Sequence, residues 1–313
     1  MLKLVGRRIL ISIPLVFLVS LLTFLLEALA PGDTVRTILG ENYTPQAYVQ
    51  LRHELGLDQS LLSQYLHWLG NALHGNLGTS PISGLSVSGQ IGTRLGVTLS
   101  LIVCTTLVAA LVGLALGVLS AVRGGVFGKV VDVLSLVGFA LPTFWFGLVL
   151  VTVFAVLVRL LPATGYVPLT ASPGEWVRAL ILPVLALAVH PIAVIAKQTR
   201  DGMLAALSRD FVHSLRANGI SEGSIVFRHA LRNAAVPVVT VIGLMFVGLL
   251  NGTVLIEAVF AMPGLGGLAV QSTTAHDLPV IQGVAVTFTV IVVVINLLVD
   301  LAYGWLNPKV RVR

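Results

Sequence analysis

Residues 95–122, LGVTLSLIVCTTLVAALVGLALGVLSAV, contain no Asp, Glu, Lys or Arg side chain. An α-helix needs about 20 mostly apolar residues to cross the hydrocarbon core of a bilayer, and this stretch is long enough to do so. Comparable stretches recur along the chain. The sequence therefore predicts an all-α integral membrane protein with six transmembrane helices, at about residues 9–30, 95–122, 131–158, 178–197, 235–256 and 279–303.

The composition of the chain supports the same class of protein. Of its 313 residues, 56% are hydrophobic and only 10% are charged, and the mean hydropathy is +0.98. A soluble domain carries about 25% charged residues, so this chain has too few charges to cover a water-soluble globule. That balance argues against a cytoplasmic enzyme, a nucleic-acid-binding module and a disordered chain. The single cysteine, Cys104, leaves no partner within the chain for a disulfide.

Two further apolar segments, and the first of the six spans, need a separate interpretation. Residues 59–93 and 258–275 also lack charge, but clusters of Gly, Ser, Asn and Pro interrupt them. We expect neither to span, although 258–275 could form a short re-entrant or interfacial piece. The first span has the basic start of a signal peptide and an Ala28-Leu29-Ala30 sequence. Its apolar run exceeds the usual 7–15 residues and Pro31 follows directly, so we expect it to be retained as a helix.

The positions of the basic residues indicate the orientation of the chain. Lys and Arg accumulate in the cytoplasmic loops of membrane proteins, and a cytoplasmic N-terminus places 14 of the 19 basic residues inside and 5 outside. The inside set is Lys3, Arg7, Arg8, Arg123, Lys129, Lys197, Arg200, Arg209, Arg216, Arg228, Arg232, Lys309, Arg311 and Arg313. The outside set is Arg36, Arg52, Arg94, Arg159 and Arg178. We therefore expect both termini to be cytoplasmic.

Two long segments lie outside the predicted spans. In the external loop, residues 31–94, five leucines recur at helical spacing beside Trp68, which predicts one or two amphipathic helices lying against the membrane surface. These are Leu51, Leu55, Leu62, Leu66 and Leu69. The largest cytoplasmic segment is residues 198–234. The chain shows no tandem repeat and no flexible linker, so we expect one integral domain over residues 1–313.

The sequence lacks the motifs that an ATPase, a proton-coupled carrier or an intramembrane serine protease would carry. A loop that cradles phosphate has the form G-x-x-x-x-G-K-[ST], and the nearest approach, Gly128-Lys129, continues into Val130. A proton-coupled carrier keeps a chain of ionisable groups deep in the bilayer, whereas His190 is the one such group, apart from Cys104, that we place well inside a span. Glu27, Asp132 and Asp300 fall near span ends. An intramembrane serine protease is disfavoured because no Gly-x-Ser-Gly element lies in a span.

The cytoplasmic segment carries a local structural signal. Residues 210–218 predict a short helix, and Gly219 suits the left-handed position that follows a helix C-terminus. Ser221 is a candidate N-cap of a second helix that runs towards Pro237. Five apolar residues upstream could share one face of a helix: Met203, Leu204, Leu207, Phe211 and Leu215. Such a face either lies on the bilayer or docks into a groove on a cytoplasmic partner.

This segment resembles the coupling loop of ABC-importer permeases, in the form found in dipeptide and oligopeptide permeases. The similarity rests first on Arg216-Ala217 before Gly219 and on the run from Arg228 to Ala234 before Pro237. It then extends to motifs along nearly the whole chain in the family's order. These are 55–59, 75–78, 141–145, 161–165, 257–260, 263–266, 277–280, 296–300 and 307–311. The short N-terminus and the long first external loop resemble the B-type subunit of a permease pair.

The resemblance implies the type I ABC-importer permease fold and a multi-pass subunit in a bacterial inner membrane. It implies as partners a second homologous permease, two cytoplasmic ATPase subunits and an extracellular binding protein, with a di- or oligopeptide as substrate. The chain is then not an enzyme and binds no cofactor or metal itself, since ATP and Mg²⁺ belong to the ATPase subunits. The residues expected to couple to the ATPases are Asp210, Phe211, Arg216, Gly219, Arg228 and Arg232.

The translocation path must be protein-lined and hydrated, because a zwitterionic peptide cannot cross hydrocarbon. The candidate lining residues are Thr143, His190, Asn251 and Gln282, each of which could instead be a helix-contact residue. Two other functions stay open. The same architecture could move nickel or another small solute, since nickel permeases resemble this group. A self-contained, ion-coupled secondary carrier is the other alternative.

Overall fold

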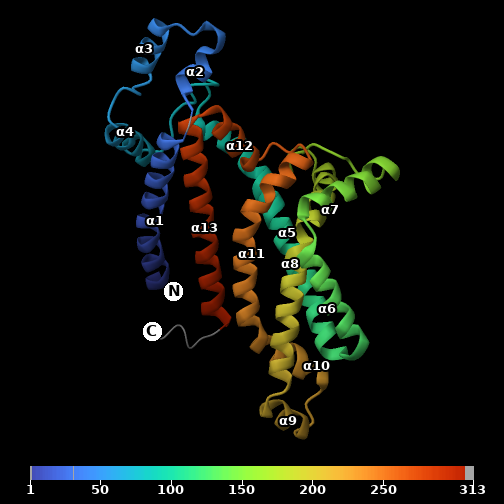
Figure 1. Cartoon of the computed structure of the whole chain (residues 1–313). Coiled ribbons are helices and arrows are strands. Elements are labelled where there is room, and N and C mark those ends of the chain that lie inside the picture. The colour runs from blue at the N-terminus through green and yellow to red at the C-terminus, as the bar shows by residue number, and fades with distance from the viewer. Residues whose placement is uncertain (1, 31, 307–313) are drawn as a thin grey trace. The chain divides into compact units, whose positions relative to one another are not determined.

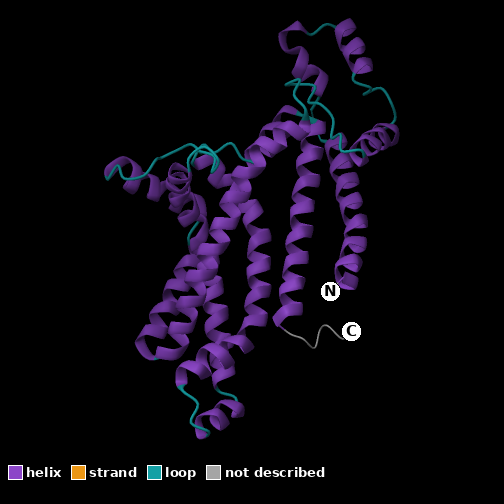
Figure 2. Cartoon of the chain, turned by 180° about the vertical axis from the view of Figure 1, so that it is seen from behind, coloured by secondary structure: helices purple, strands orange, loops and turns teal. Residues whose placement is uncertain are grey.

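The computed structural model describes the backbone of residues 2–30 and 32–306 and the side chains of residues 5–30 and 32–302. In this part of the chain the regular elements are helices, and the one β-type pairing is an isolated bridge between Thr79 and Ser86 (Figure 2). Pro31, the predicted C-terminal motif at 307–311 and some of the basic residues counted above lie outside the described residues. These basic residues are Lys309, Arg311 and Arg313, together with the side chain of Lys3.

Within residues 2–30 and 32–306, five helical stretches are long and apolar enough to cross a membrane, judged by length and composition. They are α1 (Leu2–Leu29), α5 (Val87–Arg123), α8 (Pro173–Leu207), the continuous run from α10 to α11 (Glu222–Val259), and α13 (Leu278–Leu306). α5 begins eight residues before the predicted span, and α8 extends past both predicted ends. A count of six spans requires one further bent pair of helices to act as a single span.

That bent pair corrects the predicted continuous helix at 131–158. α6 (Gly125–Ala140) and α7 (Thr143–Leu150), which continues into the π-helical η2 (Val151–Leu157), meet at an angle of 100°. Leu141 and Pro142 are both extended at the break, with ψ of 120° and 122°. A proline disfavours the helical conformation of the residue before it. The absence of charge over 133–158 therefore predicted the apolar length correctly but not the bend.

The chain divides into two compact units, and each is described here by itself. The first unit comprises residues 98–262 and 294–306, and the second comprises residues 2–97 and 263–293. The predicted single integral domain stays a prediction.

α8 lies at the centre of the first unit, where α6, α7 and α11 (Leu231–Val259) pack against it (Figure 1). α5 also approaches α8 closely. A Cβ atom added to Gly117 would lie 2.5 Å from Thr199 Cβ, and one added to Gly113 would lie 2.8 Å from Ile195 Cβ. Small residues spaced four apart permit such close helix contact, so these two glycines set the distance between the helices.

The second unit contains α1 and the external helices. These are α2 (Thr34–Leu39), η1 (Gly40–Asn42), α3 (Pro45–Glu54) and α4 (Leu61–Leu73). α3 and α4 are helices in the external loop where the sequence predicts one or two, and their place at the membrane surface stays a prediction. α12 (Leu265–Ala275) is the short helix that the second broken apolar stretch forms. A hydrophobic core joins the start of α5 to α12 and α13. It consists of Val87, Ile91, Leu265, Leu268, Val280 and Val284.

Candidate functional site

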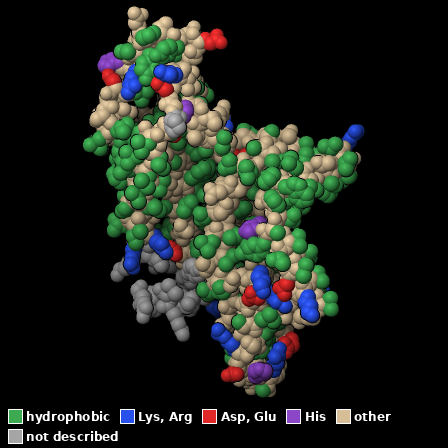
Figure 3. Space-filling model, viewed as in Figure 1, with side chains coloured by type: hydrophobic (Ala, Val, Ile, Leu, Met, Phe, Trp, Pro, Cys, Tyr) green, Lys and Arg blue, Asp and Glu red, His purple; other side chains and the backbone are tan. Residues whose placement is uncertain are grey.

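The predicted coupling segment forms a compact elbow between α8 and α11. We define the elbow as residues 208–232, which contain α9 (Asp210–Ala217), α10 (Glu222–Ser224) and the π-helical η3 (Ile225–Ala230). In the first unit, α9 and α10 lie at one end of the helices (Figure 1). Charged side chains gather at this same end (Figure 3). The elbow is therefore a separate feature at one end of this unit rather than a continuation of α8.

The structure corrects the single apolar face predicted for residues 203–215. α8 ends at Leu207, and Arg209 takes an extended conformation with ψ of 150°, so Phe211 and Leu215 belong to α9 instead. Within α9, Val212 is fully buried in the chain itself, whereas Phe211 and Leu215 are half-buried. Met203, the first residue of the predicted stripe, is also fully buried, so part of that stripe is already covered by the chain's own residues.

Gly219 makes the turn that ends α9. Its φ of +76° is in the left-handed region, as the sequence predicts. The amide of Gly219 donates to the carbonyl of Arg216 at 3.0 Å, and the amide of Ile220 donates to the carbonyl of Leu215 at 3.1 Å. This pair of bonds is the Schellman motif, which satisfies the last carbonyls of a helix and favours glycine at this position.

An ion pair spans the same turn. Arg216 Nε donates to Glu222 Oε1 at 2.6 Å, and Arg216 Nη2 donates to Glu222 Oε2 at 3.1 Å. The hydrogen bond that Arg216 donates to Glu222, and then the negative charge of Glu222, hold the pKa of Arg216 above its ordinary value. Both side chains are exposed, and exposed pairs contribute little to overall stability. A bidentate pair does fix relative orientation, so Arg216 ties α9 to the start of α10.

Ser221 occupies the predicted N-cap position, but its side chain makes no capping bond.

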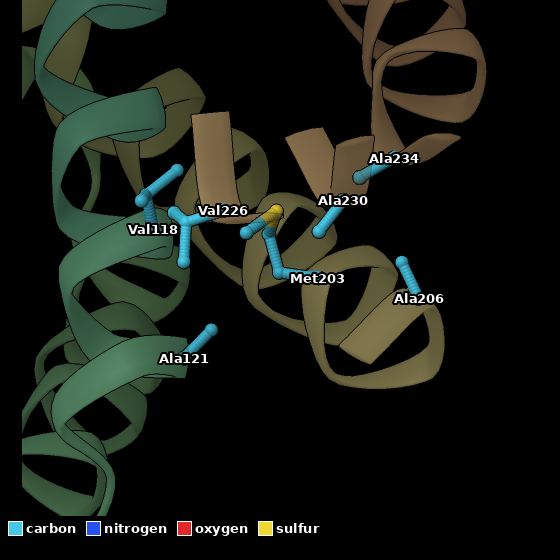
Figure 4. Close-up of a cluster of buried hydrophobic side chains, with 7 residues drawn as sticks. All are labelled: Val118, Ala121, Met203, Ala206, Val226, Ala230 and Ala234. Carbon is cyan, nitrogen blue, oxygen red and sulfur yellow. The ribbon is translucent and has the colours of Figure 1, made fainter. Parts of the chain in front are cut away.

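The base of the elbow is anchored in a buried cluster of small and flexible side chains (Figure 4). Met203 from α8 lies at its centre and is fully buried. The other members come from α5, α8, η3 and α11: Val118, Ala121, Ala206, Val226, Ala230 and Ala234. Gly202 on α8 packs against Ala234, since a Cβ at this glycine would lie 3.1 Å from Ala234 Cβ. The base of the elbow is therefore packed directly against three long helices, α5, α8 and α11.

Ion pairs join α6 to α8 just above the elbow. Arg200 Nη1 lies 3.1 Å from Asp132 Oδ2, and Arg200 is mostly buried, with 18% of its side chain exposed. Lys197 Nζ lies 3.0 Å from Asp201 and 3.9 Å from Asp132. Two basic residues that the sequence analysis assigned only to topology thus also hold α6 against α8.

The other predicted coupling residues are accessible. Asp210 begins α9, where a carboxylate is favourable at the positive end of the helix dipole. Arg228 in η3 and Arg232 at the start of α11 are both exposed. The structure thus brings five of the six predicted coupling residues to the exposed elbow, and Phe211 lies half-buried beside them. Their role in coupling stays a prediction.

The four candidate path residues are not joined into one site. Thr143 begins α7 and is half-buried, and Asn251 on α11 is exposed. The ring of His190 on α8 meets Phe139 edge-on at 5.0 Å, which is a helix-packing contact. Gln282 is fully buried in the second unit and donates from Nε2 to the Ser20 carbonyl at 2.6 Å. No hydrogen bond among the described residues links any two of these four side chains.

Sequence reasoning missed two buried carboxylates. Glu257, near the end of α11, is 1% exposed and accepts a hydrogen bond of 2.6 Å from Thr98 Oγ1. Asp277, just before α13, accepts one of 2.5 Å from Ser80 Oγ. Burial raises the pKa of Asp277, although the Ser80 bond opposes the shift. The sequence does carry a signal for the burial of Glu257, because this single acidic residue directly follows the apolar span 235–256.

Known proteins share this architecture and sequence along the chain. The family described as binding-protein-dependent transport system inner membrane component matches residues 113–312, and the corresponding N-terminal family matches residues 1–102. The chain belongs to this family. It is a multi-pass inner-membrane permease.

Full-length relatives support the assignment. A relative from Brucella abortus (strain 2308) is 41% identical over 312 residues. The di/tripeptide transport system permease protein DppB of Pseudomonas aeruginosa is 39% identical over 333 residues, and the dipeptide transport system permease protein DppB of Escherichia coli (strain K12) is 38% identical over 336 residues. In all three comparisons 99% of each chain is covered.

A solved structure confirms the fold. A chain of the MetNI methionine ABC transporter in an inward-facing conformation matches with a TM-score of 0.53, at 18% sequence identity. The match covers 69% of this permease and 96% of that chain. The permease therefore has the type I ABC-importer permease fold that its sequence predicts.

Proposed function

We propose that this permease forms half of the translocation pathway of an ATP-driven importer for di- and oligopeptides. The observation that carries the proposal is the full-length similarity to permeases named for dipeptide and di/tripeptide transport. A substrate with two terminal charges needs a protein-lined path through the bilayer. The long helices of the first unit supply half of such a path.

We further propose that ATP is hydrolysed on separate subunits. The sequence lacks the phosphate-cradling motif that an ATPase carries. The elbow supplies the surface that a cytoplasmic ATPase would contact, because it exposes Asp210, Arg216 and Arg228 while its base is packed on α5, α8 and α11. This chain then needs no cofactor of its own, and Mg²⁺ and ATP stay with the ATPase subunits.

The remaining partners follow from the same proposal. A second homologous permease completes the pathway, two ATPase subunits dock on the cytoplasmic side, and an external binding protein delivers the peptide. The path carries few charged side chains, so we propose that specificity is set mainly by the binding protein. His190 and Asn251 would then hydrate the path rather than select the substrate.

The proposal is tested by uptake into proteoliposomes that contain the permease, its partner permease, both ATPases and the binding protein. We expect ATP-dependent accumulation of a labelled dipeptide, and an excess of Ni²⁺ should not compete with it. Omission of this chain should abolish uptake. Accumulation of Ni²⁺ without peptide would contradict the peptide proposal, and uptake by this chain alone under a proton gradient would contradict the whole assignment.

A further inference from the structure

The external helix α4 presents two apolar surfaces, of which the described residues of the second unit cover only one. Tyr65 on the covered side is 2% exposed and packs on α1. Leu62, Leu66 and Leu73 form a stripe on a neighbouring flank and are 66%, 54% and 79% exposed. The opposite face of the helix carries polar residues such as His67 and Asn71. The stripe is therefore an apolar surface without a cover inside the second unit.

The contacts of Tyr65 place α4 against a defined part of α1. The ring packs edge-on against Phe17 and Phe24, with centroid distances of 5.9 and 5.5 Å. Its hydroxyl shares a hydrogen bond of 2.8 Å with Ser20 Oγ. Phe17, Ser20 and Phe24 follow one another at about one turn each, so Tyr65 contacts about two turns of α1. α4 itself lies near the C-terminal end of α1 (Figure 1).

With the N-terminus on the cytoplasmic side, as the basic residues predict, that stretch of α1 falls in the outer leaflet. Arg8 and Glu27 are the charged residues at the two ends of its apolar run. A rise of 1.5 Å per residue separates them by about 28 Å, which is close to the bilayer's hydrocarbon thickness of about 30 Å. On the same scale Phe24 lies about 5 Å, and Phe17 about 15 Å, below the level of Glu27.

We propose that α4 is a membrane anchor, with the stripe of Leu62, Leu66 and Leu73 inserted among the acyl chains of the outer leaflet. Apolar side chains of α1 at the same depth are also left uncovered by the described residues, since Leu18 and Leu22 are 50% and 47% exposed. Interfacial helices bury an apolar face about 5–10 Å into this boundary. The anchor holds the external helices at the bilayer surface.

The absence of charged residues in α4 also indicates which lipid headgroup it requires. The sequence of α4, LLSQYLHWLGNAL, contains no Asp, Glu, Lys or Arg. Its insertion is therefore apolar rather than electrostatic, and Trp68 beside Tyr65 is of the residue type that concentrates at membrane interfaces. A zwitterionic lipid is sufficient, and added salt should not release the helix.

The proposal is tested by fluorescence quenching in the assembled transporter, reconstituted into phosphatidylcholine vesicles. On a Cys104→Ser background, Leu62→Cys is labelled with an environment-sensitive fluorophore and compared with Asn71→Cys. The two positions are nine residues apart and so face opposite sides of the helix. Leu73→Cys provides a second, independent position on the stripe. The quencher is phosphatidylcholine that carries a nitroxide near the top of its acyl chain.

We expect quenching several-fold stronger at Leu62→Cys and Leu73→Cys than at Asn71→Cys, with no change on raising the salt concentration. Equal quenching at the three positions would overturn the proposal. Weak quenching at both stripe positions would also overturn it, because water or another protein chain would then cover the stripe.

Discussion

Gly219 is the residue on which the geometry of the elbow depends most directly. Its left-handed φ of +76° is unfavourable for any residue with a Cβ, at a cost of about 1–2 kcal/mol. A penalty of that size shifts a conformational equilibrium by about 5- to 30-fold. No atom lies within 4 Å of the position that a Cβ would take, so the penalty is conformational rather than steric.

We therefore expect Gly219→Val to uncouple ATP hydrolysis from peptide uptake while leaving membrane insertion intact. The measurement is the ratio of transported peptide to hydrolysed ATP in the reconstituted transporter. Gly223→Val is the matched control, because Gly223 lies in the same elbow with equally open surroundings but without a positive φ. Full uptake by Gly219→Val would remove this turn from the mechanism.

His53 gives the external helices a pH-dependent contact. Its Nδ1 lies 2.6 Å from Asp58 Oδ2, and this hydrogen bond raises the pKa of His53. A raised folded-state pKa means that the contact stabilises the fold below the ordinary histidine pKa of about 6.5. The stabilisation is lost as the pH rises through the folded-state value.

We expect the last turn of α3 to lose hydrogen-exchange protection, corrected for intrinsic rates, as the pH rises above the ordinary histidine pKa of about 6.5. His53→Gln should remove this pH dependence, whereas His74→Gln, at the end of α4, should keep it. Protection that falls equally in His53→Gln would show that another group is responsible.

At the scale of elements, the spacing of α5 and α8 is set by glycine. The space beside Gly117 is already filled by Thr199 and the carbonyl of Ala196. Overpacking of a tight contact costs about 1–3 kcal/mol. We expect Gly117→Ala to lower the thermal stability of the purified transporter accordingly. Gly92→Ala on the same helix meets nothing within 4 Å and should not lower it. Equal stability of the two variants would show that α5 and α8 are farther apart.

Sequence patterns predicted those elements whose cause is local. Gly219 follows a helix and precedes Ser221, so the turn is encoded within a few residues. The break at Ser208 was not predictable in this way, because apolar spacing continues across it from Met203 to Leu215 and no Gly or Pro marks it. The bend at Pro142 carried a local signal, but counting apolar length does not reveal an angle.

The local features of the candidate site were likewise predictable from the sequence, and its long-range contacts were not. The exposed residues of the elbow follow from their neighbours in sequence, whereas the Arg216–Glu222 pair forms only once the turn has closed. The burial of Glu257 depends on Thr98, which is 159 residues away. Long-range partners of this kind leave no periodic signal in a single sequence.

At the scale of the whole molecule, we propose that this permease changes conformation when the ATPase subunits bind or hydrolyse ATP. A ligand changes a conformational equilibrium only by its difference in affinity for the two states. A shift from 1:99 to 99:1 requires a difference of about 5.5 kcal/mol. The elbow is where we expect that energy to enter, since its base packs on α5, α8 and α11.

The most direct test of this claim is photo-crosslinking from the elbow in the assembled transporter. A photo-reactive amino acid is placed at His213, which is exposed on α9, and a control is placed at exposed Asn76 in the external segment. The account predicts an adduct with an ATPase subunit from His213, altered in yield by ATP, and no such adduct from Asn76. Adducts from His213 with lipid alone would contradict it.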